Sequence, residues 1–424
     1  MIPIIDKKTF EQTYTRCHSR DRQIQKQVTD IISTVIEKKD RALFDYTKKF
    51  DNVELTTFRV PQNTMFSALE ELDRDTRSIF ENAIKNVQAF HKKQYQKSWT
   101  QVLDDGTKLG QRFTAIDRVG IYIPGGRAVY PSTLIMNAVP AKIAGVPSIV
   151  TISPPGPTGL PHSLILATCA LLELDEVYSV GGAHGIAALA YGTESIAPVY
   201  KITGPGNAYV AEAKRQVFGI VGIDSIAGPS EILILHDDTD IPIEFIVRDL
   251  ISQAEHDPDA RCTVITVSEI TAKKIAEQLE TLIPQLPRKE IIMQSLQNNG
   301  HIICVDHLDE GIELVNTIAP EHFELLVKDT SILPKIRNAG AIFVGQWSSE
   351  PAGDYYAGPN HTLPTNGAAR YAAPLGVQDY QKHSSYIEYT RDRLMAQGKE
   401  IVHFAELEEL YAHAAAIKVR LENA

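Results

Sequence analysis

Between residues 118 and 345 the chain alternates short apolar runs with segments of helical length, and this alternation restricts the possible folds more than any other feature. The runs in the first half are apolar almost throughout, as are strands of a parallel sheet covered on both faces. They are VGIYIPGG (119–126), SIVTISPP (148–155), EVYSVGGAHG (176–185) and PVYKITGPGN (198–207). Strands that alternate with helices indicate βαβ units. Residues 118–230 are therefore predicted to form a Rossmann-like domain.

A second series of strand-like runs follows, again separated by helical segments: SEILILH (230–236), CTVITVS (262–268), HIICVD (301–306), FELLV (323–327) and AIFVG (341–345). The predicted fold class is α/β, with two Rossmann-like parallel-sheet domains of related topology. We assign the helix-rich opening to the second domain, which then comprises residues 24–117 and 231–370. Residues 1–23 and 371–424 are expected to form an extended arm and tail, irregular except for an amphipathic helix near Phe404–Tyr411.

Composition narrows the class of protein. A chain of 424 residues exceeds the usual size of one domain. Its net charge of −11, with no compensating basic segment, argues against nucleic acid as a partner. No apolar run is long enough to cross a membrane, and the first residues do not resemble a secretory signal. The cysteines lack metal-binding or CxxC spacing and are expected to be free thiols in the cytoplasm; they are Cys17, Cys169, Cys262 and Cys304.

Two polar residues interrupt an apolar helical stripe in DLISQAEHDPDA. The stripe runs through Ile243, Ile246 and Leu250, and its next steps are Gln253 and His256. A buried amide and imidazole need partners, and a metal ion would satisfy both. The alternative is a helix end with a hydrogen-bonded glutamine and a half-exposed histidine, and these residues alone favour that alternative.

Other polar residues with chemical potential follow in loops. Glu321 and His322 directly precede an apolar strand, where they could handle two proton transfers in one cleft or simply be exposed. Asp354 and His361 lie in a long Gly/Pro-rich loop, and both side chains are ordinary ligands of divalent metal ions. Glu408 and His413 lie in the tail, where a histidine is usually a surface residue.

Three predicted strand ends are rich in glycine, which lets backbone approach a phosphate group. They are Pro124-Gly125-Gly126, Gly181-Gly182 and Gly204-Pro205-Gly206-Asn207. None of them matches the full dinucleotide-binding fingerprint. Each is as typical of ordinary turns as of a nucleotide site, but three at one sheet edge favour binding.

These motifs together resemble the histidinol dehydrogenase family. The resemblance rests on segments that occur in the family's order between residues 118 and 413: GIYIPGG, GPGNAYVAEAKRQV, AGPSEILI, DLISQAEHDPDA, APEHFEL, GDYYAGPNHTLPT and the closing E-x-L-x-x-H. It implies a zinc-dependent, NAD-linked four-electron oxidation of L-histidinol, through L-histidinaldehyde, to L-histidine. It also implies a cytoplasmic homodimer that uses its tail in dimerisation and holds one zinc ion per subunit.

The resemblance also implies roles for particular residues. Glu321 and His322 match the acid–base pair, in which His322 takes the alcohol proton and Glu321 activates the water that hydrates the aldehyde. The metal ligands would be Gln253, His256, Asp354 and His413, of which His413, with Glu408, would come from the other subunit.

The substrate would contact Ser230, Gln253, His256, His322, Asp354, His361, Glu408 and His413. NAD would contact Tyr122, His184 and Asn207, although the family commonly has glutamine at position 184. Two other functions stay open at this point. One is a paralogous zinc- and NAD-dependent dehydrogenase acting on another small polar alcohol, and the other is a non-catalytic metal- or ligand-binding α/β protein.

Overall fold

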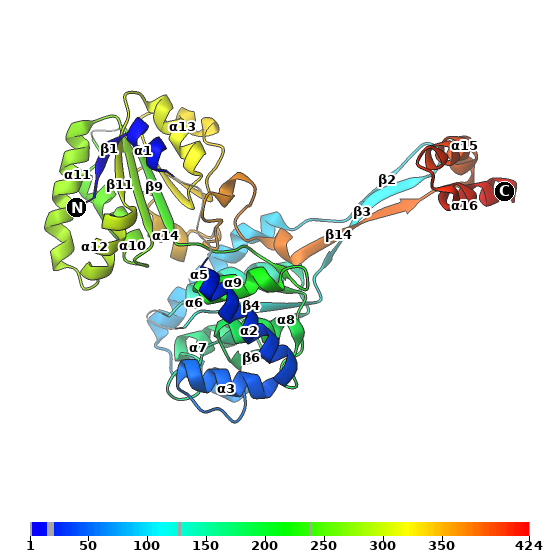
Figure 1. The fold of residues 1–424 in the computed structure, drawn as a ribbon, viewed down its shortest axis with the longest axis horizontal. Helices are drawn as coiled ribbons and strands as arrows, with labels where there is room; N and C mark the ends of the chain where they lie inside the picture. Colours follow the sequence, from blue (N-terminus) through cyan, green and yellow to red (C-terminus); the bar gives the residue numbers. More distant parts are fainter. Residues whose placement is uncertain (1, 15–20, 126–128, 238–239, 424) are drawn as a thin grey trace.

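A computed structural model describes residues 2–14, 21–125, 129–237 and 240–423. Two parallel sheets form the body of the molecule, and a narrow ribbon projects from it (Figure 1). The first sheet has the order β6-β5-β4-β7-β8. Its strands are β4 (Arg118–Tyr122), β5 (Ser148–Ser153), β6 (Glu176–Ser179), β7 (Lys201–Thr203) and β8 (Gly222–Ile223). In chain order this is 3-2-1-4-5, the arrangement of a Rossmann sheet.

The second sheet has the order β1-β11-β10-β9-β12-β13 and is also parallel throughout. Its strands are β1 (Ile4–Asp6), β9 (Glu231–His236), β10 (Arg261–Thr266), β11 (His301–Cys304), β12 (His322–Leu326) and β13 (Ala341–Val344). Without β1, the order is again 3-2-1-4-5. The prediction of two Rossmann-like sheets of related topology is therefore confirmed.

The helical opening packs on the first sheet, which differs from its predicted assignment to the second. Its helices are α2 (Arg22–Lys38), α3 (Asp40–Asp51), α4 (Gln62–Glu70) and α5 (Arg74–His91), followed by the 3-10 turn η1 (Lys92–Gln94). The apolar face of α2, with Val28 and Val35, joins one core with Ile186 of α8. Met65 and Val87, from α4 and α5, join the core on the other side of β4.

The remaining helices connect the strands of the two sheets. Those of the first sheet are α6 (Pro131–Ala144), α7 (Ser163–Leu171), α8 (Gly182–Tyr191) and α9 (Ala208–Val217). Those of the second sheet are α1 (Lys7–Thr13), α10 (Ile243–Ala254), α11 (Glu269–Leu282), α12 (Lys289–Asn299), α13 (Leu308–Ile318) and α14 (Glu350–Tyr355), with 3-10 turns η2 (Ile283–Gln285) and η3 (Thr330–Lys335). The start of the chain thus belongs to the second sheet, because β1 pairs with β11.

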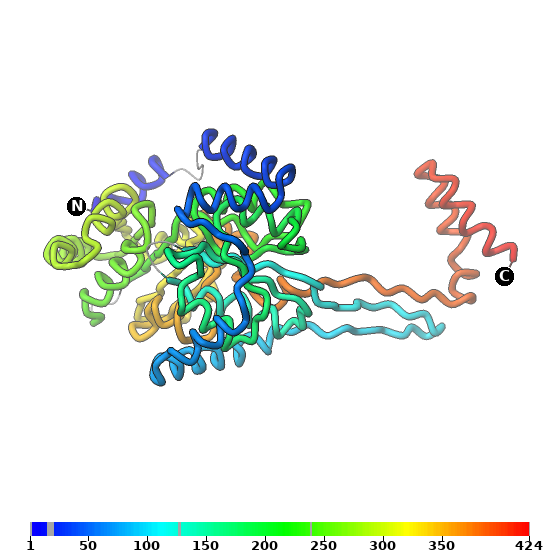
Figure 2. Tube along the Cα trace, turned by 90° about the horizontal axis from the view of Figure 1, so that it is seen from below, coloured from blue at the N-terminus to red at the C-terminus, as the bar shows by residue number. Residues whose placement is uncertain are grey.

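The ribbon contains residues from two distant parts of the sequence. β2 (Trp99–Val102), β3 (Lys108–Ala115) and β14 (Gln381–Glu388) form an antiparallel sheet, preceded by η4 (Ala368–Arg370) and η5 (Val377–Tyr380). At its far end α15 (Arg391–Leu407) packs against α16 (Tyr411–Glu422). We call residues 99–115 and 381–423 the arm. Two perpendicular views place its helices well away from both sheets (Figures 1 and 2).

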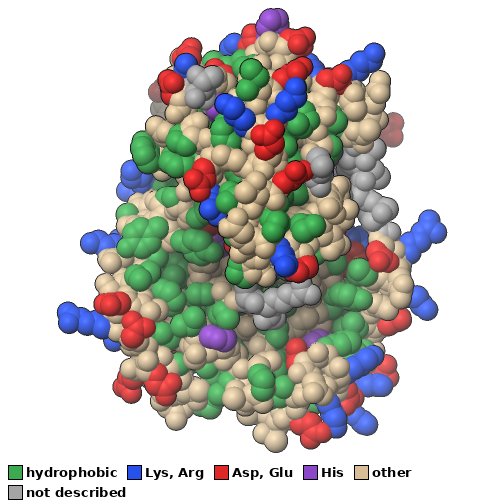
Figure 3. Space-filling view, turned by 90° about the vertical axis from the view of Figure 1, so that its left-hand side faces the viewer, with side chains coloured by type: hydrophobic (Ala, Val, Ile, Leu, Met, Phe, Trp, Pro, Cys, Tyr) green, Lys and Arg blue, Asp and Glu red, His purple; other side chains and the backbone are tan. Residues whose placement is uncertain are grey.

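The arm corrects two predictions. Residues 99–115 were assigned to an α/β domain but belong to the ribbon, and the tail is mostly regular structure rather than irregular chain. Charged side chains of both signs are mixed over the face of the body in Figure 3, with a hollow between its upper and lower halves. Across the described residues, no helix is both long and apolar enough to span a bilayer.

Candidate active site

The Glu321–His322 pair lies at the amino-terminal edge of the second sheet. His322 is the first residue of β12, which pairs in parallel register with β9, and Glu231 is the first residue of β9. Ser230 directly precedes the same strand. Ligands of α/β sheets usually bind at the opposite, carboxyl edge. This position explains how Gln253, at the carboxyl end of α10, comes close to His322, because α10 returns to the start of the strands.

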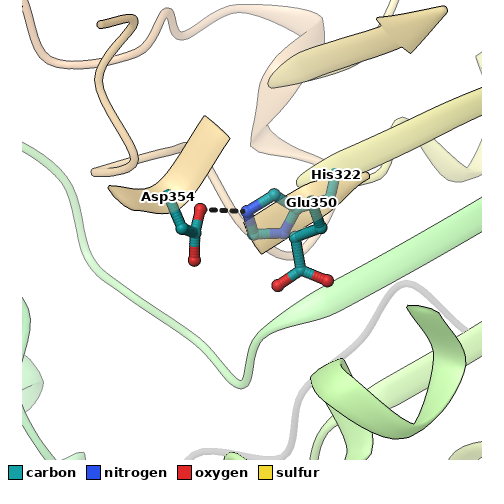
Figure 4. Close-up of side chains that lie close together, drawn as sticks. All are labelled: His322, Glu350 and Asp354. Carbon is teal, nitrogen blue, oxygen red and sulfur yellow. Dashed lines mark ion pairs between the residues drawn. The ribbon is translucent and has the colours of Figure 1, made fainter. Parts of the chain in front are cut away.

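The backbone of Glu231 contacts both members of the pair. Its N–H donates to Oε2 of Glu321 at 2.8 Å, and its carbonyl oxygen lies 3.0 Å from Nδ1 of His322. A carbonyl can only accept, so Nδ1 of His322 carries a proton, and Nε2 is the nitrogen that can exchange one with a ligand. Nε2 has no hydrogen-bond partner and lies 3.5 Å from Oδ1 of Asp354 (Figure 4). The imidazole is thus oriented to take up a proton at Nε2.

Burial and nearby charge act on this pair in opposite directions. Only 6% of Glu321 and 3% of His322 is exposed. Burial raises the pKa of Glu321 to about 8, against the charge of His322. Burial lowers the pKa of His322, but the carboxylates of Glu321, Asp354 and Glu350 outweigh it and raise this pKa above its ordinary value. The pKa of His322 is raised to about 10, so near neutral pH both side chains hold their protons in this group of buried carboxylates.

Three side chains that could each donate to a metal ion lie close together at this position. His322, Glu350 and Asp354 each offer a ligand atom, and these atoms lie within 4.8 Å of one another. Both carboxylates project from α14 toward the imidazole (Figure 4). Glu350 was not among the predicted site residues. The proline that follows it is typical of the first turn of a helix, and this pattern was the signal that the loop is ordered at this point.

Gln253 belongs to this cluster. Its side chain is buried, and one terminal atom of its amide lies 3.1 Å from Nδ1 of His322 and 3.1 and 3.3 Å from the two carboxylate oxygens of Glu350. His256 follows the end of α10 and is exposed as a residue; partial burial of its ring lowers its pKa, and the charge of Asp354 opposes this shift. Imidazole and carboxylate groups are ordinary ligands of divalent metal ions, whereas a glutamine oxygen is an uncommon one.

His361 connects the loop after α14 to the first sheet. Its Nδ1 donates to the backbone oxygen of Asp354 at 2.9 Å, and its Nε2 accepts from the Thr133 hydroxyl of α6 at 3.3 Å. The neighbouring Asn360 donates to the backbone oxygen of Met136 at 2.6 Å. His361 and Asp354 are therefore brought together, and the loop that holds them is attached to both halves of the body.

Glu408 and His413 lie far from this cluster within one chain. Both are exposed; Glu408 ends α15 and His413 lies in the first turn of α16, at the far end of the arm. The cluster itself lies in the body, where Glu350 and Asp354 belong to α14 (Figures 1 and 2). The structure thus brings together Gln253, His256, Asp354 and His322 but separates them from Glu408 and His413.

The residues matched to NAD contacts line one cavity of about 950 Å³ at the carboxyl edge of the first sheet. Tyr122 ends β4, Asn207 caps α9 after β7, and His184 lies in the first turn of α8. The cavity lies where the strand order reverses, which is the usual ligand position. Part of its wall is rich in proline, with Pro124, Pro154, Pro155 and Pro157. Gly126 falls outside the described residues.

The glycine-rich loop before Asn207 has little freedom. Gly204 has φ of +111°, and a Cβ atom there would lie 2.1 Å from the backbone oxygen of Tyr122. Lys214 donates to the Gly204 oxygen at 2.9 Å, and the Gly204 N–H donates to Asp224 at 2.8 Å. Lys214 and Asp224 form a buried ion pair. This pair holds the loop that carries Asn207 into the cavity wall.

His184 differs from a freely titrating histidine. It is 1% exposed, and burial lowers its pKa to about 3, so the ring is neutral. Its Nε2 lies 3.5 Å from the Thr47 hydroxyl, and its Nδ1 has no partner. A neutral imidazole in the wall can exchange a hydrogen bond with a ligand, as a glutamine can, without adding charge.

A Rossmann sheet with a large cavity at its switch point, beside a second sheet with a buried Glu–His pair and metal-ligating side chains, defines a dinucleotide-dependent oxidoreductase. Comparison with known proteins identifies which one. The histidinol dehydrogenase family model matches residues 14–421. The chain belongs to the histidinol dehydrogenase family.

Individual members of this family are similar to the chain over nearly its whole length. Histidinol dehydrogenase of Halalkalibacterium halodurans is 48% identical over 400 residues, covering 94% of each chain. That of Bacillus subtilis is 47% identical and covers 93% of this chain and 92% of its own. The crystal structure of histidinol dehydrogenase from Elizabethkingia anophelis superposes with a TM-score of 0.94 at 35% identity, over 99% of this chain and 98% of that one. These findings give no support to a paralogue acting on another small polar alcohol.

Proposed function

We propose that this chain oxidises L-histidinol through L-histidinaldehyde to L-histidine, with zinc at the Gln253 cluster and two molecules of NAD used in turn. The observation that carries the proposal is the buried His322, whose Nδ1 is held by the Glu231 carbonyl and whose Nε2 faces Asp354. His322 takes the hydroxyl proton as the substrate carbon gives up hydride. Glu321, whose raised pKa lets it exchange protons near neutrality, then activates the water that adds to the aldehyde.

The metal site would be built from Gln253, His256 and Asp354 of one chain and His413 of a second copy. Bound there, zinc would hold the substrate nitrogen atoms and so keep the reacting carbon in place between the two oxidations. Ser230, His361 and the partner's Glu408 would complete the contacts to the substrate. The neutral donor set of His256 and Gln253, together with the carboxylate of Asp354, supports a divalent cation here.

The arm supports a homodimer in which the tips are exchanged. Its terminal helices expose large apolar side chains: Phe404 is 65% exposed, Leu407 70% and Tyr411 65%. Large exposed apolar side chains gathered on one pair of helices are typical of a protein interface. His413 belongs to α16, which lies well away from α10, the helix of Gln253, within one chain (Figures 1 and 2). We therefore propose that each arm crosses to the other subunit and delivers His413 and Glu408 there.

The cavity of the first sheet would hold NAD, in contact with Tyr122, His184 and Asn207. Its size suits a large ligand, and its place at the switch point supports a dinucleotide. A cytoplasmic location is part of the same proposal, because the cysteines among the described residues, Cys169, Cys262 and Cys304, are free thiols.

The function is tested by incubating the zinc-loaded protein with NAD and L-histidinol and following NADH by absorbance and histidine by chromatography. We expect two NADH for each histidine formed. The same assay with other short amino alcohols and polyols gives the specificity. Absence of NADH from the metal-loaded, folded protein would overturn the proposal.

A further inference from the structure

The carboxylate of Asp51 lies in the wall of the large cavity and is not used by the mechanism above. Asp51 ends α3, and its Oδ2 is shielded from solvent without a hydrogen-bond partner among the described residues. Burial raises its pKa to about 6, so the group is still mainly a carboxylate near neutral pH. An unpartnered buried carboxylate oxygen is unfavourable. A ligand that donates a hydrogen bond to it would remove this cost.

The neighbours of Asp51 suit a sugar–base ligand better than a simple ion. Tyr46 and Phe50, also from α3, have ring centroids 5.7 and 6.0 Å from that of His184, and all three line the cavity. The negative charge of Asp51 acts on Tyr122, whose hydroxyl accepts from the Gly182 N–H at 3.3 Å. Aromatic faces beside a lone acid present both a surface for a flat ring and an acceptor for hydroxyl groups.

The charges of the wall oppose a further phosphate group near this point. Among the described residues that line the cavity, the ionised side chains are Asp30, Lys49 and Asp51. Lys49 is exposed, and its Nζ lies 5.2 Å from the centre of the Phe50 ring. An extra phosphate next to Asp51 would place two negative charges together in a desolvated site.

We propose that Asp51 accepts a hydrogen bond from a ribose hydroxyl of the dinucleotide and thereby selects NAD over NADP. This inference rests on the proposed dinucleotide site. In many Rossmann domains an acid performs this task from the end of a strand of the sheet. Here the acid comes from α3, one of the helices that precede the sheet in the sequence.

The test measures dissociation constants of NADH and NADPH from cofactor fluorescence, for the wild-type dimer and for Asp51→Asn. A hydrogen bond to a charged acceptor contributes about 1.5–3 kcal/mol, which corresponds to about a 10- to 100-fold change in affinity. We expect Asp51→Asn to weaken NADH binding by about tenfold or more while weakening NADPH binding less or improving it. The ratio of the two constants should therefore fall toward one.

Asp45→Asn is the matched control, because it removes the same charge from an exposed position of the same helix, α3, outside the wall of the cavity. It should leave the NADPH-to-NADH ratio close to that of the wild type. Asp51→Ser is the second variant, with a smaller side chain that leaves room for the phosphate, and it should shift the ratio in the same direction. Circular dichroism establishes that each variant is folded.

Three outcomes decide the matter. A lowered ratio in both Asp51 variants, but not in Asp45→Asn, supports the proposal. An unchanged ratio in the folded Asp51 variants overturns it and leaves the proposed function intact. Failure of the wild-type protein to bind either dinucleotide overturns the assignment of the cavity itself, and the role of Asp51 with it.

Discussion

The backbone carbonyl oxygen of Glu231 lies 3.0 Å from Nδ1 of His322. The two residues begin adjacent parallel strands, β9 and β12, so this contact is set by the register of the sheet and not by a flexible loop. It determines which imidazole nitrogen can act as a base. The same residue, through its N–H, holds Glu321 at 2.8 Å.

Substitutions of Glu321 and of His322 should impair different stages of the reaction. His322→Ala removes the base for the alcohol proton, and we expect turnover of histidinol to fall by about 10²- to 10⁴-fold. Glu321→Gln should instead impair hydration of the aldehyde, so that NADH formed per histidine exceeds two and aldehyde accumulates. Rapid-quench analysis of aldehyde and histidine separates the stages. Equal loss at both stages in Glu321→Gln would contradict the assigned role.

Subunit mixing tests whether the arm crosses to the partner. His413→Ala and His322→Ala are each expected to be inactive, and random exchange of their subunits should restore about one quarter of wild-type activity. The reason is that about half of the dimers are hybrids and each hybrid has one intact site. Mixing His322→Ala with Glu321→Ala is the control, because both changes lie in the body and no intact site can form. No rescue despite exchange shown by mass spectrometry would contradict the crossing.

Glu350 should influence zinc affinity through Gln253. Its carboxylate oxygens lie 3.1 and 3.3 Å from the Gln253 amide and help to fix the position of that amide. Loss of a residue that orients a metal ligand typically lowers affinity about 10- to 100-fold. We expect a change of this size for Glu350→Gln in competition with a chromophoric chelator, independently of turnover. Glu290→Gln, at an exposed position of α12, should leave zinc affinity unchanged.

The Arg118–Glu176 ion pair should make the free energy of unfolding depend on pH in the acidic range. Arg118 donates to both carboxylate oxygens of Glu176, at 2.7 and 2.5 Å, and both side chains are 18% exposed. Burial raises the pKa of Glu176, but the hydrogen bonds from Arg118 and Tyr178 outweigh it and lower this pKa below 4.5. A lowered carboxyl pKa stabilises the fold above the unfolded value, and this stability is lost as pH falls through the folded value.

Glu176→Gln should therefore cost about 1–3 kcal/mol near neutral pH and much less below about pH 4. Thermal unfolding followed at both pH values measures the difference from the wild type. Glu244→Gln removes a partner from an exposed ion pair with Arg248 and should have little effect at either pH. A deficit of Glu176→Gln that persists undiminished in acid would show that packing, and not charge, holds this position.

The sheets were predictable because their strands are buried on both faces, so that composition alone marks them. The helices of residues 22–91 were assigned to the wrong sheet. An amphipathic pattern predicts that one face of a helix is buried, but it does not predict which sheet that face packs against. The strands of the arm escaped prediction for the opposite reason. Every residue of β2 is exposed, and β14 is exposed from Lys382 onward, so no apolar period marks them.

Some residues of the candidate site could be predicted from the sequence and others could not. Gln253 and His256 were selected because they break an apolar stripe, and the burial of Gln253 confirms that the stripe faces inward. Glu231 and Asp51 were not selected, because each takes its position from tertiary contacts. Glu231 acts largely through its backbone, whose partners depend on the pairing of β9 with β12. Asp51 meets the cavity only once α3 packs on the first sheet.

The proline-rich wall of the cavity has a consequence for the successive binding of two NAD molecules in the proposed reaction. Two NAD molecules must enter the same cavity in turn while the aldehyde stays in place. Pro124, Pro154, Pro155 and Pro157 have fixed φ angles and little side-chain freedom, so they lose little entropy when a ligand arrives. This part of the wall does not need to reorder at each exchange. Each NAD molecule in turn can therefore bind without the entropic cost of ordering this part of the wall.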